Sequence, residues 1–100
     1  MRIDVNGSRL YFDVEGVGYV IDGSSAEERP TLILLHGSPG TSDHTVFKPL
    51  FRRLTDVAQI VYLDLRGSGR SDDAPDGIYS LERWADDLHA FCRQLGIDEP

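Results

Sequence analysis

Hydrophobic and polar positions alternate with a period of two on either side of Asn6-Gly7-Ser8. Ile3 and Val5 precede this segment, and three apolar residues follow it at the same spacing: Leu10, Phe12 and Val14. Such alternation is typical of strands that bury one face, and Asn-Gly favours a tight hairpin turn. We therefore expect a β-hairpin over residues 2–14.

Two uninterrupted apolar runs lie further along the chain, Thr31 to Leu35 and Ala58 to Leu63. A strand that is buried on both faces, as in a parallel sheet, has no alternation and reads as a continuous apolar run. Both runs therefore indicate central strands. Residues 15–30 are rich in glycine, serine and acidic residues, and we expect a loop there with Tyr19 to Ile21 as a candidate short strand.

Two further segments have helical spacing. In Val46 to Leu54 the apolar residues fall three and four positions apart, with Pro49 in the first turn. A longer helix is expected to begin after Ser80, a favourable N-cap, and to end at Gly96. Its apolar face would carry Leu81, Trp84, Leu88, Phe91, Cys92 and Leu95.

The order of these elements predicts the fold class. A hairpin followed by strand, helix, strand and helix is typical of an α/β fold, in which crossover helices join parallel strands. One hundred residues allow one domain at most, and no linker composition interrupts the chain. We expect residues 1–100 to belong to a single α/β unit.

Charge and composition exclude several classes of partner. Seventeen acidic against ten basic residues give a formal net charge of −7, which repels nucleic acids and anionic membranes. No apolar run is long enough for a signal peptide or a membrane span. Cys92 is the single cysteine, so no internal disulfide can form. We therefore expect a cytoplasmic protein that binds neither nucleic acid nor membrane.

Two glycine-rich motifs follow the two central strands. The first is His36-Gly37-Ser38-Pro39-Gly40, and the second runs from Asp64 to Asp72 with the sequence DLRGSGRSD. In open α/β sheets, ligands bind where the parallel strands end. The two motifs are therefore the candidate site.

The pairing of HGxPG with DxRGxGxS resembles the α/β-hydrolase family, and most closely its prolyl-aminopeptidase-like branch. That branch typically has HGGPG, whereas this chain has Ser38 in place of the second glycine. The resemblance covers essentially the whole chain but well under half of a typical family member. It implies the N-terminal part of an α/β-hydrolase sheet, and hydrolysis of an ester, amide or peptide bond in a small molecule or peptide.

The resemblance also implies an oxyanion hole, a set of N–H donors that stabilise negative charge on a carbonyl oxygen. One donor comes from the loop after the third strand of the family's sheet, here the backbone N–H of Ser38. Gly37 and Gly40 would let this loop turn tightly beside the substrate. Pro39 has no N–H and can only line the substrate.

The histidines are expected to have supporting roles. In this fold the catalytic histidine follows the nucleophile along the chain, so His36 is in the wrong place and should instead hold its loop through ring hydrogen bonds. His44 is expected to open the first helix and to be exposed or line the site entrance. His89 is expected at the boundary of the last helix's apolar face. The three histidines lack metal-ligand spacing, and we expect neither a metal nor a cofactor.

The second motif implies a structural loop. Asp64 and Arg66 should pair or bond backbone groups, while Gly67 and Gly69 suit unusual backbone angles. Ser71 and Asp72 are expected to cap the residues that follow. A phosphate-binding loop does not fit, because its third glycine would fall at Asp72 and no Gly-Lys-Ser/Thr occurs.

The nucleophile elbow, Gly-x-Ser-x-Gly, does not occur in these 100 residues. Three interpretations stay open: an N-terminal fragment of a serine hydrolase that is inactive alone, a truncated non-catalytic domain that pairs with another chain, and a haloalkane-dehalogenase-like enzyme. The last is disfavoured because that branch usually has Asn or Glu at the position of Ser38. In the family's sheet the Thr31–Leu35 strand would lose one neighbour, so we expect self-association through this edge.

Overall fold

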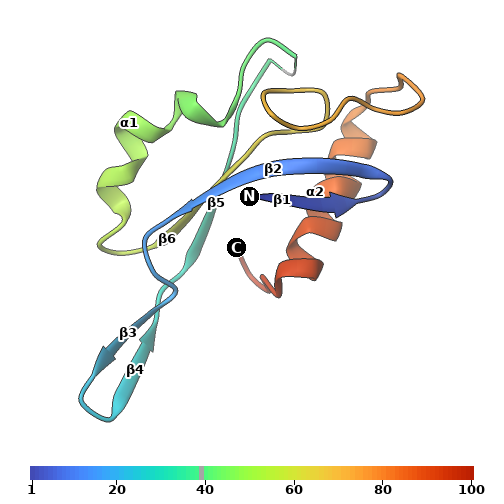
Figure 1. Cartoon of the computed structure of the whole chain (residues 1–100). Helices are drawn as coiled ribbons and strands as arrows, with labels where there is room; N and C mark the ends of the chain where they lie inside the picture. Colours follow the sequence, from blue (N-terminus) through green and yellow to red (C-terminus); the bar gives the residue numbers. More distant parts are fainter. Residues whose placement is uncertain (39) are drawn as a thin grey trace.

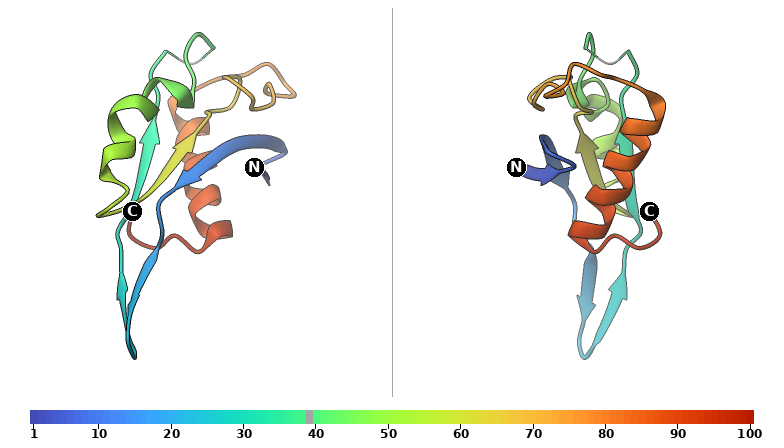
Figure 2. Two further views of the ribbon diagram at one scale, coloured as in Figure 1. Left: turned by 60° about the vertical axis from the view of Figure 1, so that its left-hand side comes forward. Right: turned by 90° about the vertical axis from the view of Figure 1, so that its right-hand side faces the viewer.

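The computed structural model describes residues 1–38 and 40–100 and contains a four-stranded sheet with helical elements on its two faces (Figures 1 and 2). Strand β1 (Arg2–Val5) pairs with β2 (Ser8–Glu15) in antiparallel fashion. The turn between them has positive φ at both Asn6 (49°) and Gly7 (78°), as mirror-image hairpin turns require. The predicted N-terminal hairpin is therefore confirmed.

The two apolar runs form the parallel part of the sheet. Strand β5 (Thr31–Leu35) pairs in parallel with β6 (Gln59–Leu63), and β6 also pairs with β2, giving the order β1-β2-β6-β5. Alternate residues of β6 pack into two different hydrophobic clusters, one on each face of the sheet. Val61 and Leu63 pack with Phe91, whereas Ile60 and Tyr62 pack with Phe47. Burial on both faces explains why the run has no polar alternation, and the predicted α/β class is confirmed.

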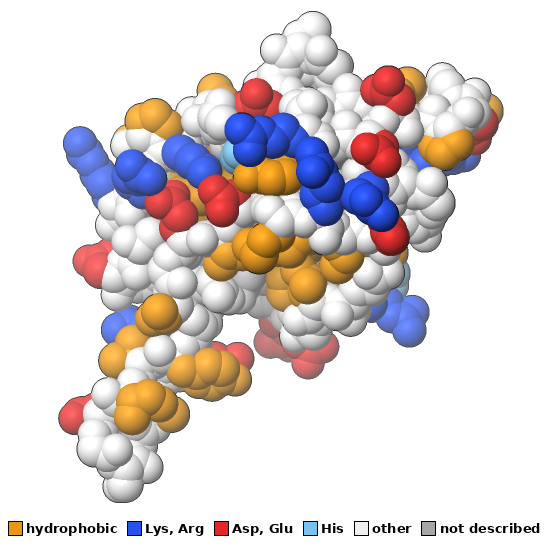
Figure 3. Space-filling view, viewed as in Figure 1, with side chains coloured by type: hydrophobic (Ala, Val, Ile, Leu, Met, Phe, Trp, Pro, Cys, Tyr) orange, Lys and Arg blue, Asp and Glu red, His pale blue; other side chains and the backbone are white. Residues whose placement is uncertain are grey.

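The loop expected at residues 15–30 contains two strands, and the candidate short strand at Tyr19 to Ile21 is confirmed as part of the first of them. Strands β3 (Tyr19–Asp22) and β4 (Ser25–Glu28) form a second hairpin that projects from the body of the molecule (Figures 1 and 2). Figure 3 shows hydrophobic side chains on its surface, and Tyr19 and Ile21 are 61% and 69% exposed. Because neither face of this hairpin is buried, its second strand, Ser25–Glu28, has no apolar pattern that could predict it.

The first helical segment lies where expected but is irregular. A 3-10 turn, η1 (His44–Val46), precedes one α-helical turn, α1 (Lys48–Phe51), and another 3-10 turn, η2 (Arg52–Leu54), follows. Pro49 falls in the first turn of α1, as predicted. Ion pairs fix this segment to β2: Lys48 with Asp13, and Arg52 with Glu15 at 2.8 Å. The hydrogen bond from Lys48 lowers the pKa of the Asp13 carboxyl.

Helix α2 (Leu81–Leu95) covers the other face of the sheet (Figure 2). The hydroxyl of Ser80 accepts from the Arg83 N–H, and Gly96 ends the helix with φ 69°, so both predicted ends are confirmed. Phe91 is fully buried, and its ring meets that of Phe12 edge to face at 5.1 Å.

Three side chains of α2 lie differently from the prediction. Leu81 and Leu95 are 79% and 41% exposed, and His89 is exposed rather than at a boundary. Contact with the hydrophobic cluster of the sheet is made by Leu88, Ala90, Phe91 and Cys92 instead. None of the helices in residues 1–38 and 40–100 is both long and apolar enough to cross a membrane.

Candidate functional site

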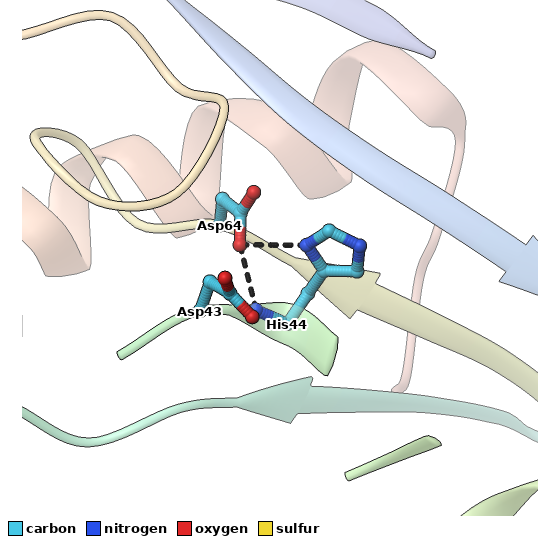
Figure 4. A group of neighbouring side chains, drawn as sticks. All are labelled: Asp43, His44 and Asp64. Carbon is cyan, nitrogen blue, oxygen red and sulfur yellow. Dashed lines mark hydrogen bonds and ion pairs between the residues drawn. The ribbon is translucent and has the colours of Figure 1, made fainter. Parts of the chain in front are cut away.

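The two motifs meet at the carboxyl ends of β5 and β6, and the Asp64 carboxylate joins them (Figure 4). Asp64 follows β6 directly and is completely buried. Its Oδ1 accepts from the backbone N–H of His44 at 2.7 Å and from His44 Nδ1 at 2.8 Å. Its Oδ2 accepts from the backbone N–H of Arg70 at 2.9 Å. One side chain therefore fixes the end of the first loop and the course of the second.

The backbone of Asp64 is held as firmly as its side chain. Its N–H donates to the Tyr11 carbonyl at 3.0 Å, and its carbonyl accepts from the Ser71 hydroxyl at 2.6 Å. The same Ser71 oxygen accepts from the Tyr11 N–H at 2.9 Å. The expectation that Ser71 caps a following element is therefore wrong, because its hydroxyl ties the loop back to β2.

His36 supports the first loop, as expected. Its Nε2 accepts from the backbone N–H of Leu65 at 3.1 Å, which requires the neutral tautomer with the proton on Nδ1. Nδ1 then donates to the Gly37 carbonyl at 2.9 Å. Since both ring nitrogens are occupied and the residue is 3% exposed, His36 holds the loop and is not placed to act as a base.

The apex of the first loop has an unusual backbone. Ser38 has φ 45°, in the left-handed region that costs a non-glycine residue roughly 1–2 kcal/mol. Its carbonyl accepts from the N–H groups of Thr41 and Ser42 at 2.9 and 3.1 Å, which closes the turn. Gly40 has φ 86°, whereas the tight turn expected at Gly37 falls instead at Ser38. Pro39 lies outside the described residues.

Ser38 is exposed, and its backbone N–H is the candidate oxyanion donor. Its backbone N–H has no hydrogen-bond acceptor within residues 1–38 and 40–100. A left-handed turn that leaves one N–H unpaired at the end of a parallel strand has the form of an oxyanion donor. Glycine suits this φ better than serine, which gives a physical reason for HGGPG in the related branch.

Arg66 anchors the second motif to helix α2, independently of Asp64. Its Nε and Nη2 each donate to the Asp87 carboxylate at 2.8 Å, and Nη2 also reaches the Asn6 carbonyl at 3.0 Å. The hydrogen bonds that Arg66 donates to Asp87 raise the pKa of the Arg66 guanidinium. Asp64 and Arg66 therefore bond different partners and do not pair with each other.

Sequence reasoning missed Asp87 as the partner of Arg66. The signal was present, because Asp87 occupies an otherwise apolar position of α2, three residues after Trp84 and four before Phe91. A charged residue on an apolar helix face is costly to bury without a partner, so it indicates one. Gly67 and Gly69 have φ 80° and 53°, which confirms the expected unusual angles.

The burial of His44 corrects a further expectation. It does open η1, but it is 4% exposed and packs against the Tyr11 ring at 5.1 Å rather than facing solvent. His44 and Asp64 have the form of the acid–histidine half of a catalytic triad. In the described part of the chain, no serine hydroxyl or cysteine thiol bonds this imidazole, and the pair holds the loop to β6.

Asp43, His44 and Asp64 also place three candidate metal-ligand atoms within 4.8 Å of one another (Figure 4). Hydrogen-bond donors of the chain already engage carboxylate oxygens of this group. Both Asp64 oxygens accept N–H groups, and Asp43 accepts from the hydroxyl and the N–H of Thr45, which together lower the pKa of Asp43. The cluster therefore fits a hydrogen-bonded support better than a cation site.

Comparisons with known proteins agree with this geometry. The family described as alpha/beta hydrolase fold matches residues 30–100. A proline iminopeptidase of Clostridioides difficile is 32% identical over 83 residues, which cover 81% of this chain and 28% of that protein. The probable oxidoreductase EphD of Mycobacterium tuberculosis is 32% identical over 94 residues, which cover 93% of this chain and 16% of that protein.

Among solved structures, the enol-lactonase of Burkholderia xenovorans LB400 superposes with a TM-score of 0.77 at 26% identity. The match covers 97% of this chain and 34% of the lactonase. This chain thus spans only 16% and 28% of the two curated relatives named above, and about a third of the solved structure.

Two glycine substitutions test the role of Asp64. A Cβ at Gly69 would lie 2.4 Å from Asp64 Oδ2, whereas a Cβ at Gly40 would meet no atom within 4 Å. Both residues have positive φ, so Gly40→Ala should cost only backbone strain, roughly 1–2 kcal/mol of unfolding free energy. Gly69→Ala should cost roughly 2–5 kcal/mol, because it also displaces a buried acceptor from its donors. Equal losses in urea denaturation would contradict the central role of Asp64.

Proposed function

Because this chain belongs to the α/β-hydrolase fold family, we propose that it supplies the oxyanion-loop part of a serine-type hydrolase of ester, amide or peptide bonds. The observation that carries this proposal is the backbone N–H of Ser38 after the end of β5, which has no acceptor among the residues that the structure describes. The supports of this loop are buried side chains, chiefly His36 and Asp64, which hold it before any substrate arrives.

The chemistry follows from the position of that donor. Attack on a carbonyl carbon moves negative charge onto the carbonyl oxygen. A fixed N–H donor then stabilises the charge by about 2.7–4 kcal/mol, because it needs no reorganisation during the reaction. In this fold the second donor follows the nucleophile on its elbow. On this proposal the nucleophile, the triad acid and the triad histidine lie outside these 100 residues.

The relatives favour a substrate class without fixing it. Proline iminopeptidases are among the similar proteins, which supports a peptide substrate and an aminopeptidase-like reaction. The similar enol-lactonase acts on an ester-type bond by its name, so the broader class of ester, amide and peptide bonds is retained. Ser38 contributes through its backbone, while Gly37 and Gly40 would line the substrate.

The 100-residue chain alone should have no hydrolase activity. Attack requires an activated nucleophile, and removing triad members costs many powers of ten in rate. A p-nitrophenyl ester and a prolyl-anilide are suitable substrates for the assay. Turnover that survives extensive purification and disappears on a point substitution in this chain would overturn the proposal.

Two substitutions at Ser38 test the donor in a longer protein that contains this segment and is active. Ser38→Ala keeps the backbone N–H and should change kcat little. Ser38→Pro deletes the N–H and should lower kcat by at least about 10²-fold. Equal effects of the two substitutions would show that the serine side chain, and not the backbone donor, takes part.

A second candidate role is pairing with another chain, and the open edge of the sheet favours it. Strand β5 has β6 on one side and no strand on the other among the described residues. It carries no charge and no proline, whereas the opposite edge strand β1 has exposed Arg2 and Asp4. An uncharged, apolar edge is a template for further pairing, and we propose a second copy as its partner.

Sedimentation velocity at micromolar concentration tests this pairing. The chain should sediment as a dimer or larger species, and Leu35→Lys should shift it toward monomer, because Leu35 is 41% exposed and lysine blunts strand edges. Leu81→Lys is the matched control, since Leu81 is 79% exposed on the distant helix α2. A monodisperse wild-type monomer, or an equal response to both substitutions, would reject the edge as the interface.

A further inference from the structure

The apex of the first loop needs a restraint, because its backbone is unfavourable. Ser38 has φ 45° without being a glycine, and an unrestrained serine would leave this region to gain roughly 1–2 kcal/mol. The direction of its N–H depends on that same backbone. An oxyanion donor has to be aimed before the reaction, so whatever restrains the apex also sets the direction of the donor.

Three hydrogen-bonded ties join this loop to the second motif. His36 accepts from Leu65 N–H before the apex, and His44 donates to Asp64 after it. The third tie lies between them: the hydroxyl oxygen of Ser68 accepts from the Gly40 N–H at 2.7 Å. Within the described residues, Ser68 is the one side chain of the second motif that bonds the backbone of residues 37–42.

Ser68 is itself held in place. It is 2% exposed, its N–H donates to the Leu65 carbonyl at 2.9 Å, and its own carbonyl accepts from the Ser71 N–H at 3.0 Å. These two backbone bonds do not depend on the hydroxyl of Ser71. The hydroxyl that reaches Gly40 therefore projects from a rigid frame rather than from a loose loop.

We propose that Ser68 is a positioning residue, whose buried hydroxyl holds Gly40 and thereby keeps the Ser38 N–H aimed as an oxyanion donor. This inference rests on the proposed function of Ser38. Its role is separable from general stability, because the ties at His36 and His44 remain when the Ser68 hydroxyl is removed. The ends of the loop then stay attached while the apex relaxes.

The experiment uses the ¹⁵N,¹³C-labelled 100-residue chain with Ser68→Ala and, as a control, Ser71→Ala. Ser71 offers a matched hydroxyl from the same motif, but it bonds β2 and Asp64 rather than the first loop. NMR reports the hydrogen exchange of the Gly40 amide and the φ-dependent coupling and carbon shifts of Ser38. Spectra of sedimented protein give the same signals if the chain self-associates.

In Ser68→Ala, the Gly40 amide should exchange about tenfold faster, because it loses its one hydrogen bond; a tenfold change corresponds to about 1.4 kcal/mol. The Ser38 signals should move away from their left-handed values. In Ser71→Ala both sets of signals should stay close to wild type.

Unchanged Gly40 and Ser38 signals in Ser68→Ala would overturn the proposal. So would equal changes in Ser71→Ala, because they would indicate general loosening of the motif. Neither readout needs turnover. A longer protein that proves inactive would therefore count against the proposed function, whereas unmoved apex signals count against the role of Ser68 alone.

Discussion

The buried carboxylate of Asp64 is the constraint on which the rest of this site depends. A fully buried carboxylate is costly unless hydrogen-bond donors surround it, and here three N–H groups converge on its two oxygens. Those donors come from His44 and Arg70, so satisfying one side chain fixes two loops. The same buried carboxylate requires glycine at position 69, because any Cβ there would clash with the carboxylate of Asp64.

Arg66, two residues further on, anchors the opposite layer. It pairs with Asp87 of α2, whereas Asp64 holds η1 beside α1, so this short segment connects the helical elements on both faces of the sheet. A buried ion pair adds little stability by itself, but breaking one partner leaves an uncompensated charge. The pair thus specifies where α2 lies, and the second motif acts as the junction of the fold.

The parts of this structure that the sequence predicts are those with local signals. The Asn6-Gly7 turn, the Ser80 cap and the doubly buried strand β6 each show their physical cause within a few residues. The parts that could not be predicted depend on distant partners. The burial of His44 requires Asp64, and β4 has no buried face to produce a pattern.

In the candidate site, too, some features have local sequence signals and others depend on distant partners. Its loops could be located from their motifs, but the roles of Ser68 and Ser71 depend on which backbone groups the fold brings to their hydroxyls. A serine in a polar, glycine-rich loop is usually a turn residue, and only tertiary contact distinguishes these two. Ser71 joins the loop to β2, while Ser68 faces the first motif.

On the proposed function, Ser38 acts through its backbone N–H, and this explains which positions of the site can change residue type and which cannot. Every residue except proline would supply this N–H at position 38, so serine can replace the glycine of HGGPG at the cost of backbone strain. The supports have no such freedom, because His36, Asp64 and Ser68 each act through a particular side-chain atom. Strain at Ser38 persists because these contacts over-determine its loop, which is the usual condition for strained backbone at functional sites. The constraint on sequence therefore falls on the residues that hold the donor, more than on the donor itself.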